Sequence, residues 1–191
     1  TAISGALGII VNGAAGAIPD TATKMLNIAH KNSLRLIHLV NDLLDMEKLV
    51  SGKMEFKSEG IDLCLLTQQA IEATSNYAAA LGVHYHFQEP EMAASVKGDP
   101  QRVMQVFANL LSNAAKFSPK SAAVEVRLLC QQNHWRVEVE DKGAGIPLEF
   151  RDQIFSKFAQ ADGSNTRQQG GTGLGLNIAK SFVEKMGGEI G

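Results

Sequence analysis

The sequence predicts an α+β fold: a two-layer α/β sandwich, in which helices cover a mixed sheet, preceded by a helical hairpin. Three observations lead to this prediction. Residues 23–50 have a helical hydrophobic period, strand-like and helix-like segments are interspersed from residue 53 onward, and two adjacent strand-like segments read as an antiparallel hairpin. We therefore expect two domains, a helical hairpin over 1–52 and an α/β domain over 53–191.

The first domain reads as two helices joined by a short turn. Residues 1–11 are apolar and compatible with a helix, whereas residues 12–18 are mostly small. Residues 23–50 contain neither proline nor glycine, and Pro19-Asp20-Thr21 supplies start signals for a long helix that Ser51-Gly52 would end. Its apolar face is wider than one short partner helix covers, which favours a four-helix bundle made by two copies of the chain. The open alternative is a helix that packs against its own domain.

In the second domain the hydrophobic period changes from element to element. The expected strands are 54–57, 83–87, 94–96, 122–130 and 135–140, and the expected helices are 63–81, 99–116 and 174–186. Asp99 and Pro100 provide the cap and the first residue of the middle helix, and Gly187-Gly188 ends the last one. The polar residues 131–133 connect the last two strands as a β-hairpin.

Composition excludes several classes of function. The chain has 191 residues, of which 45% are hydrophobic and 20% charged, as in ordinary globular proteins. A formal net charge of −2 gives no basic field for nucleic acid. No apolar run reaches the roughly 20 residues of a membrane span, so we expect no membrane contact by this part of the protein. Cys64 and Cys130 are far apart and lack metal-ligand spacing, which favours reduced thiols and a cytoplasmic location.

Two asparagines predict a magnesium site on the helix that starts at Asp99. Asn109 and Asn113 are four residues apart and therefore share a face of the helix. An amide oxygen suits Mg²⁺, which keeps several waters and commonly bridges a protein group and phosphates. Lys116, one turn later, would meet a phosphate as a point charge. The alternative is a pair of asparagines packed against a loop.

A carboxylate followed by glycines predicts a site for a flat base. Asp141 ends a strand-like segment and precedes Lys142-Gly143-Ala144-Gly145. Such a carboxylate accepts a hydrogen bond from an exocyclic amine like that of adenine, and the glycines let the base approach the backbone. The alternative is an ordinary turn, because Asp and Gly are common turn residues after a strand.

A glycine-rich segment at the start of the last helix predicts phosphate binding. Gly170, Gly171, Gly173 and Gly175 lie where free N–H groups and the positive end of the helix dipole favour anions. The segment is neither a P-loop nor a dinucleotide-binding fingerprint. The polar residues 160–169 before it are expected to cover the phosphates, and a surface loop is the alternative.

Four segments follow one another in fixed order: NLLSNAAKFSP, DKGAGIP, FSKFAQ and GGTGLGL. They resemble the N, G1, F and G2 boxes of bacterial sensor histidine kinases, in the superfamily shared with DNA gyrase and heat-shock chaperones. The resemblance covers residues 99–188, and residues 28–56 resemble the second helix of that family's dimerisation hairpin. It implies a Bergerat-type ATP-binding fold with ATP and Mg²⁺ as cofactors.

The resemblance also implies roles for single residues. Asn109, Asn113 and Lys116 would act in catalysis, with Asn113 as the Mg²⁺ ligand. The residues that would bind the nucleotide are Asn113, Lys116, Phe117, Asp141, Gly143, Gly145, Ile146, Phe155, Phe158, Gly171, Thr172, Gly173, Leu174 and Gly175. Asn109 stands where hydrolytic relatives carry a catalytic Glu, which favours phosphoryl transfer over the activation of water.

The function implied is transfer of the ATP γ-phosphoryl group to a histidine on the dimerisation hairpin, and from there to an aspartate of a response regulator. The implied partners are a second copy of the chain and a response-regulator receiver domain. None of the five histidines is followed by an acid and Thr-Pro, so we expect the acceptor upstream of Thr1. Two alternatives stay open: an ATP-hydrolysing switch like gyrase or the chaperones, and a non-catalytic nucleotide-sensing dimerisation module.

Overall fold

The structure is a computed structural model that describes residues 2–14, 16, 18–160 and 172–191. It divides into two compact units, Thr1–Met54 and Glu55–Gly191. None of the helices described combines the length and the apolar character needed to cross a bilayer.

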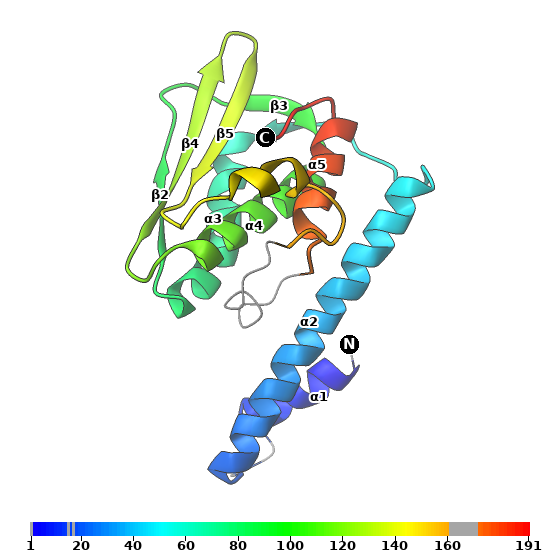
Figure 1. Cartoon of the computed structure of the whole chain (residues 1–191), viewed down its shortest axis with the longest axis vertical. Helices are drawn as coiled ribbons and strands as arrows, with labels where there is room; N and C mark the ends of the chain where they lie inside the picture. Colours follow the sequence, from blue (N-terminus) through cyan, green and yellow to red (C-terminus); the bar gives the residue numbers. More distant parts are fainter. Residues whose placement is uncertain (1, 15, 17, 161–171) are drawn as a thin grey trace. The chain divides into compact units, whose positions relative to one another are not determined.

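The first unit is a pair of helices, α1 (Ala2–Val11) and α2 (Asp20–Val50), which pack against each other (Figure 1). The helical hairpin is thus confirmed. After α2 the chain turns at Gly52, whose φ of +66° lies in the left-handed region that glycine tolerates. The backbone N–H groups of Lys53 and Met54 both donate to the carbonyl of Lys48, at 3.0 and 3.2 Å. These bonds satisfy the end of the helix and hold the chain to it as far as Met54.

The described residues of the second unit form helices and two small sheets. The helices are α3 (Leu63–Ala80), α4 (Pro100–Phe117), the short 3₁₀ helix η1 (Leu148–Gln153) and α5 (Gly175–Lys185). The strands are β1 (Glu59–Asp62), β2 (His84–Gln88), β3 (Ser95–Gly98), β4 (Ala123–Gln131) and β5 (His134–Glu140). Strand β4 is the middle of a sheet of three, parallel to β2 and antiparallel to β5, while β1 and β3 form an antiparallel pair.

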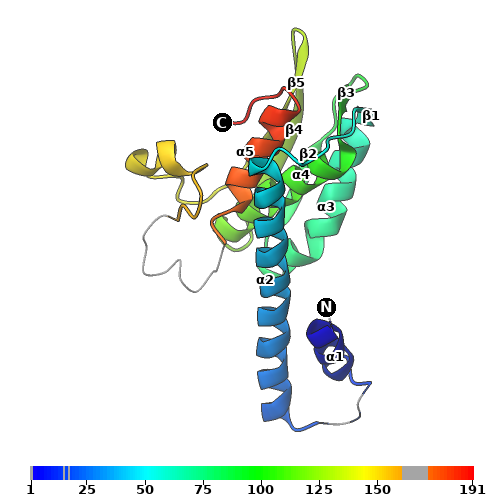
Figure 2. The same cartoon turned by 90° about the vertical axis from the view of Figure 1, so that its right-hand side faces the viewer.

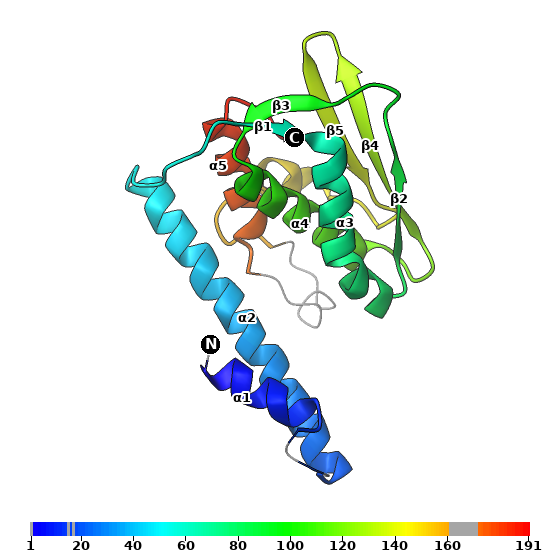
Figure 3. The same ribbon diagram turned by 180° about the vertical axis from the view of Figure 1, so that it is seen from behind.

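Helices α3, α4 and α5 lie on one side of the three-stranded sheet (Figures 1, 2 and 3). Alternate residues of β4 point to that side, and Val124, Val126 and Leu128 are at most 4% exposed. On the helix layer, Leu111 of α4 and Phe182 of α5 are also fully buried. The predicted α+β fold with a mixed sheet under helices is confirmed.

Three details of the prediction were wrong. The strand expected at 54–57 is absent, and β1 lies at Glu59–Asp62 instead. The alternation of polar and apolar residues at 54–57 fits a strand, but the backbone N–H of Lys57 donates to a side chain, Asp99 Oδ2, rather than to a neighbouring strand. The strands described form two sheets rather than one, and the 3₁₀ helix η1 was not foreseen.

The carboxylate of Asp99 fixes the start of α4. Its Oδ1 accepts hydrogen bonds from the N–H groups of Gln101 and Arg102, and its Oδ2 accepts one from Lys57 at 3.0 Å. Asp99 is 5% exposed. Burial by itself raises the pKa of this carboxyl, but the three backbone donors and the charge of Arg102 outweigh it, so that the pKa lies below its ordinary value. Asp99 therefore connects Lys57, in the segment after α2, to the start of α4, the helix on which Asn109 and Asn113 lie.

Replacing Asp99 by Ala should lower the free energy of unfolding by about 2–3 kcal/mol, because three part-buried N–H groups lose their acceptor. Urea unfolding measures this change. The matched control is Asp62→Ala, which removes an exposed N-cap of α3 with one bond, to the N–H of Leu65, and should cost about 1 kcal/mol. The stability that the ionised Asp99 carboxylate adds to the wild type is complete above the ordinary pKa of 3.8. It is lost as the pH falls through the lowered folded-state pKa of Asp99. Equal losses in the two variants would contradict this account.

Candidate nucleotide-binding site

The C-terminal half of α4 presents polar and aromatic groups side by side. Asn109 and Asn113 lie one turn apart and are both half-buried. Among the described residues, no hydrogen bond is found for the side chain of Asn113. Lys116 Nζ lies 4.5 Å from the ring centroid of Phe117, which is 49% exposed at the end of the helix. This end of α4 therefore offers an amide, a cation and an aromatic face.

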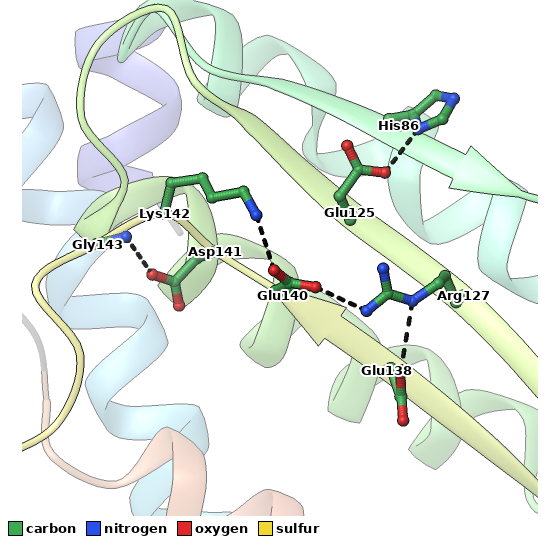
Figure 4. Close-up of polar contacts among 8 residues, drawn as sticks. All are labelled: His86, Glu125, Arg127, Glu138, Glu140, Asp141, Lys142 and Gly143. Carbon is green, nitrogen blue, oxygen red and sulfur yellow. Dashed lines mark hydrogen bonds and ion pairs between the residues drawn. The ribbon is translucent and has the colours of Figure 1, made fainter.

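The turn after β5 packs against the same end of α4. The N–H of Gly143 donates to Asp141 Oδ1 at 2.7 Å (Figure 4). A Cβ atom at position 143 would lie 2.6 Å from the carbonyl oxygen of Phe117, so only glycine fits there. The close approach brings the carboxylate of Asp141 next to Phe117. Further along the turn, Gly145 has a φ of +75° and Ile146 is 44% exposed.

The start of α5 packs closely against the segment 155–158. Gly173 has a φ of +69°, and a Cβ atom there would lie 2.8 Å from backbone atoms of Phe158. Thr172 Oγ1 accepts a hydrogen bond from the N–H of Leu174, which is buried. Leu174 occupies the N-cap of α5 and has no polar side chain to cap the helix. The first N–H groups of α5 therefore suit an anion.

Side-chain amides complete the connections among these segments. Asn109 Nδ2 on α4 donates to the carbonyl of Gly175 at 3.2 Å. Asn177 Nδ2 on α5 donates to the carbonyl of Phe155 at 2.7 Å. Together with the Gly143 contact to Phe117 and the Gly173 contact to Phe158, these bonds join all four motif segments. Residues spread over about a third of the chain thus form one continuous structure.

The structure places nearly all of the predicted site residues in this region. Those brought together by the contacts above are Asn109, Phe117, Asp141, Gly143, Phe155, Phe158, Thr172, Gly173, Leu174 and Gly175. Asn113 and Lys116 lie on the same helix as Asn109 and Phe117. Gly145 and Ile146 continue the turn that begins at Asp141. Gly171 and most of the expected cover at 160–169 lie outside the described residues. Sequence reasoning missed Asn177 and Lys180, although Asn177 follows the glycine-rich segment directly.

A network of ion pairs lies on the face of the three-stranded sheet that the helices do not cover. Glu140 accepts hydrogen bonds from Lys142 Nζ and from Arg127, both at 2.7 Å (Figure 4). Arg127 also pairs with Glu138 at 3.5 Å. The bond from Lys142, together with the contact to Arg127, lowers the pKa of Glu140 to about 2. Glu140 thereby holds Lys142, the residue after Asp141, in this network on the opposite face.

Replacing Lys142 by Met should raise the pKa of Glu140 from about 2 toward its ordinary value of 4.5, because the hydrogen bond from Lys142, the largest cause of the lowered pKa, is lost. A carbon-detected NMR titration of the side-chain carboxyl measures the change. In the wild type, stabilisation by this pair is complete above the ordinary pKa of 4.5 and is lost as the pH falls through about 2. Lys180→Met on α5 is the control and should leave the titration unchanged. A Glu140 pKa that stays near 2 in Lys142→Met would refute the assignment.

Comparison with known proteins identifies the class of this domain. Residues 98–191 match the family described as histidine kinase-, DNA gyrase B-, and HSP90-like ATPase. The circadian input-output histidine kinase CikA of Synechococcus elongatus is 33% identical over 193 residues, which cover 100% of this chain and 26% of CikA. The sensor protein kinase WalK of Staphylococcus epidermidis is 33% identical over 173 residues, which cover 90% of this chain and 28% of WalK.

Solved structures agree with this class. Full-length ShkA, crystallised in complex with AMPPNP, matches with a TM-score of 0.76 and 25% identity over 97% of this chain and 38% of ShkA. The histidine kinase ThkA, solved in complex with the response regulator protein TrrA, matches with a TM-score of 0.69 and 22% identity. That second match covers 95% of this chain and 52% of ThkA, and it shows the shared fold.

The match over residues 98–191 defines the class of this domain, which belongs to the family of histidine kinase-, DNA gyrase B- and HSP90-like ATPases. Within that family the chain is homologous to the sensor histidine kinases and has their type of catalytic domain. It spans about a quarter of the length of the two curated relatives named above.

Proposed function

We propose that this chain is the catalytic core of a sensor histidine kinase, which transfers the γ-phosphoryl group of ATP to a histidine and onward to an aspartate of a response regulator. The observation that carries the proposal is the set of contacts that joins the four motif segments in a homologue of histidine kinases. Such a reaction requires positioning and neutralisation of charge more than covalent help from the protein.

The roles of the residues follow from their placement. Asp141 uses one carboxylate oxygen for Gly143, and its other oxygen is left to accept a hydrogen bond from the amine of adenine. The backbone of Phe117 lies close to the same turn, and its exposed ring would contact the base. Lys116 and the first N–H groups of α5 would bind the phosphates. The site therefore separates recognition of the base, near Asp141, from recognition of the phosphates, near α5.

Asn113 is the residue best suited to hold Mg²⁺. The described residues contain no group of three or more His, Cys, Asp and Glu side chains able to hold a metal ion. A single amide oxygen fits Mg²⁺ when phosphates and waters supply the other ligands. When bound, Mg²⁺ neutralises charge on the phosphates during transfer. We therefore expect Asn113 to serve the nucleotide-bound metal rather than a permanent metal centre.

Residues 1–52 would form the dimerisation hairpin. Many large apolar side chains of α1 and α2 are more than 40% exposed in the single chain, among them Met25, Ile28, Leu36, Leu43 and Leu44. Two hairpins packed into a four-helix bundle would cover such a surface. The receiver domain of a response regulator is the further partner we propose, supported by the complex reported for ThkA. Two free cysteines fit the reducing cytoplasm.

The second candidate function is an ATP-hydrolysing switch of the gyrase and chaperone type. Asn109 argues against it, because an amide is not a general base and this amide donates to the carbonyl of Gly175. Replacing Asn109 by Glu tests the alternative directly. If the variant hydrolyses ATP much faster than the wild type, the site has the geometry of a hydrolase and the switch returns as a candidate.

The test of kinase function is a labelling experiment. The parent protein, with whatever natural sequence precedes Thr1, is incubated with γ-labelled ATP and Mg²⁺. We expect label that is lost in acid, survives base, and is absent in Asn113→Ala. Absence of label in a protein that binds ATP tightly would overturn the kinase proposal and favour a switch or a nucleotide sensor.

A further inference from the structure

A pair of side chains on α5 holds the segment that begins at Phe155. Asn177 is half-buried and donates from Nδ2 to the carbonyl of Phe155 at 2.7 Å, a bond between residues 22 positions apart. One turn later, Lys180 Nζ lies 5.3 Å from the centroid of the Phe155 ring. Both the backbone and the side chain of Phe155 are therefore bound from the same face of α5.

The same segment touches the start of α5 a second time. The backbone of Phe158 lies so close to Gly173 that a Cβ atom there would come within 2.8 Å of it. From the other side, Asn109 of α4 donates to the carbonyl of Gly175, the first residue of the helix. The first turn of α5 is thus held between α4 and the 155–158 segment.

We propose that Asn177 is a positioning residue for nucleotide binding, which fixes the first turn of α5 through its bond to Phe155 so that the N–H groups there meet the phosphates. Asn177 acts through this bond and has no contact with the nucleotide. The inference rests on the proposed ATP site. The physical reason is that backbone donors recognise an anion only when they are held within about 0.5 Å of the productive position.

The placement predicts a signature that a general loss of stability would not give. Asp141, which recognises the base, lies in the turn that packs on the end of α4, whereas Asn177 acts on the start of α5. Loss of the Asn177 bond should therefore weaken ligands that carry phosphates and spare adenosine. From the net value of one hydrogen bond, ATP and ADP affinity should fall roughly 3- to 10-fold.

The experiment measures Kd for ATP, ADP and adenosine by calorimetry in the full chain. The variants are Asn177→Ala and Asn177→Leu, which has a similar volume and no donor. Ser181→Ala is the matched control, because Ser181 Oγ donates only within α5, to the carbonyl of Asn177. We expect weaker ATP and ADP binding in both Asn177 variants, unchanged adenosine binding, and wild-type values in Ser181→Ala.

Lys180→Met keeps the inference testable should the Asn177 variants fold poorly. The Lys180 side chain is 41% exposed. Its removal should lower the affinity for ATP about twofold and leave the affinity for adenosine unchanged. Equal losses for ATP and adenosine, or no loss in any variant, would overturn the role of Asn177 while leaving the ATP site in place. A wild-type chain that binds none of the three ligands would overturn the proposed function and this inference together.

Discussion

Replacing Asp141 by Asn should weaken ATP binding by about 10- to 100-fold, the value of a hydrogen bond to a charged group. Asp141 accepts from Gly143 with one oxygen and has a second oxygen for the amine of adenine. An asparagine side chain has one acceptor oxygen, and its NH₂ group can only donate. In either orientation its NH₂ group faces a donor, the N–H of Gly143 or the amine of the base, so one of the two bonds is lost.

The base-specific control is inosine triphosphate, which lacks the exocyclic amine. Its affinity should be low in the wild type, because its O6 acceptor faces a carboxylate, and should rise in Asp141→Asn, whose NH₂ group can donate to O6, so the preference for ATP should largely disappear. The matched protein control is Glu138→Gln, which alters a carboxylate of the ion-pair network on the opposite face. If Asp141→Asn binds both nucleotides as the wild type does, adenine is recognised elsewhere.

Replacing Gly143 by Ala should weaken ATP binding more than 10-fold and lower the free energy of unfolding by about 1–3 kcal/mol. The added methyl group would lie 2.6 Å from the carbonyl oxygen of Phe117 and 2.7 Å from Asp141 Oδ1. Both neighbours belong to the site and one is backbone, so the turn must move away from α4. Binding calorimetry and urea unfolding measure the two effects.

The matched control is Gly60→Ala. A Cβ atom at position 60 would have no heavy atom within 4 Å, outside its own chain neighbours, so the same substitution meets open space there. It should leave the affinity for ATP at the wild-type value. If Gly143→Ala bound ATP equally well, the close packing of the turn on α4 would have no part in forming the site.

Sequence predicted those parts of the fold whose signals are local. The cap at Asp99 and Pro100 predicted the start of α4 to within a residue, because the side chain of Asp99, directly after the preceding strand, accepts from the first N–H groups of the helix. The glycines after Lys185 likewise gave the end of α5. Four motifs in order located most of the residues that the structure brings together around the site.

Features that depend on contacts between distant segments could not be read from the sequence. The alternation at 54–57 fits a strand as well as 59–62 does, and pairing with β3 selects the second. The bond between Asn177 and Phe155 leaves no periodic signal either. Asparagine after a glycine-rich segment is an ordinary helix residue until the fold places a carbonyl opposite it.

The connection between the two units has a kinetic consequence. The chain is bonded to α2 as far as Met54 and to the ATP-binding unit from Lys57, where Asp99 accepts its N–H. Few residues lie between these fixed points, so the tether is short. A short flexible tether that can span two sites keeps one at an effective concentration on the order of millimolar near the other. Any group on the helical unit that this tether allows to reach the proposed nucleotide site would therefore act as a local reactant at high concentration, whatever the concentration of the protein in the cell.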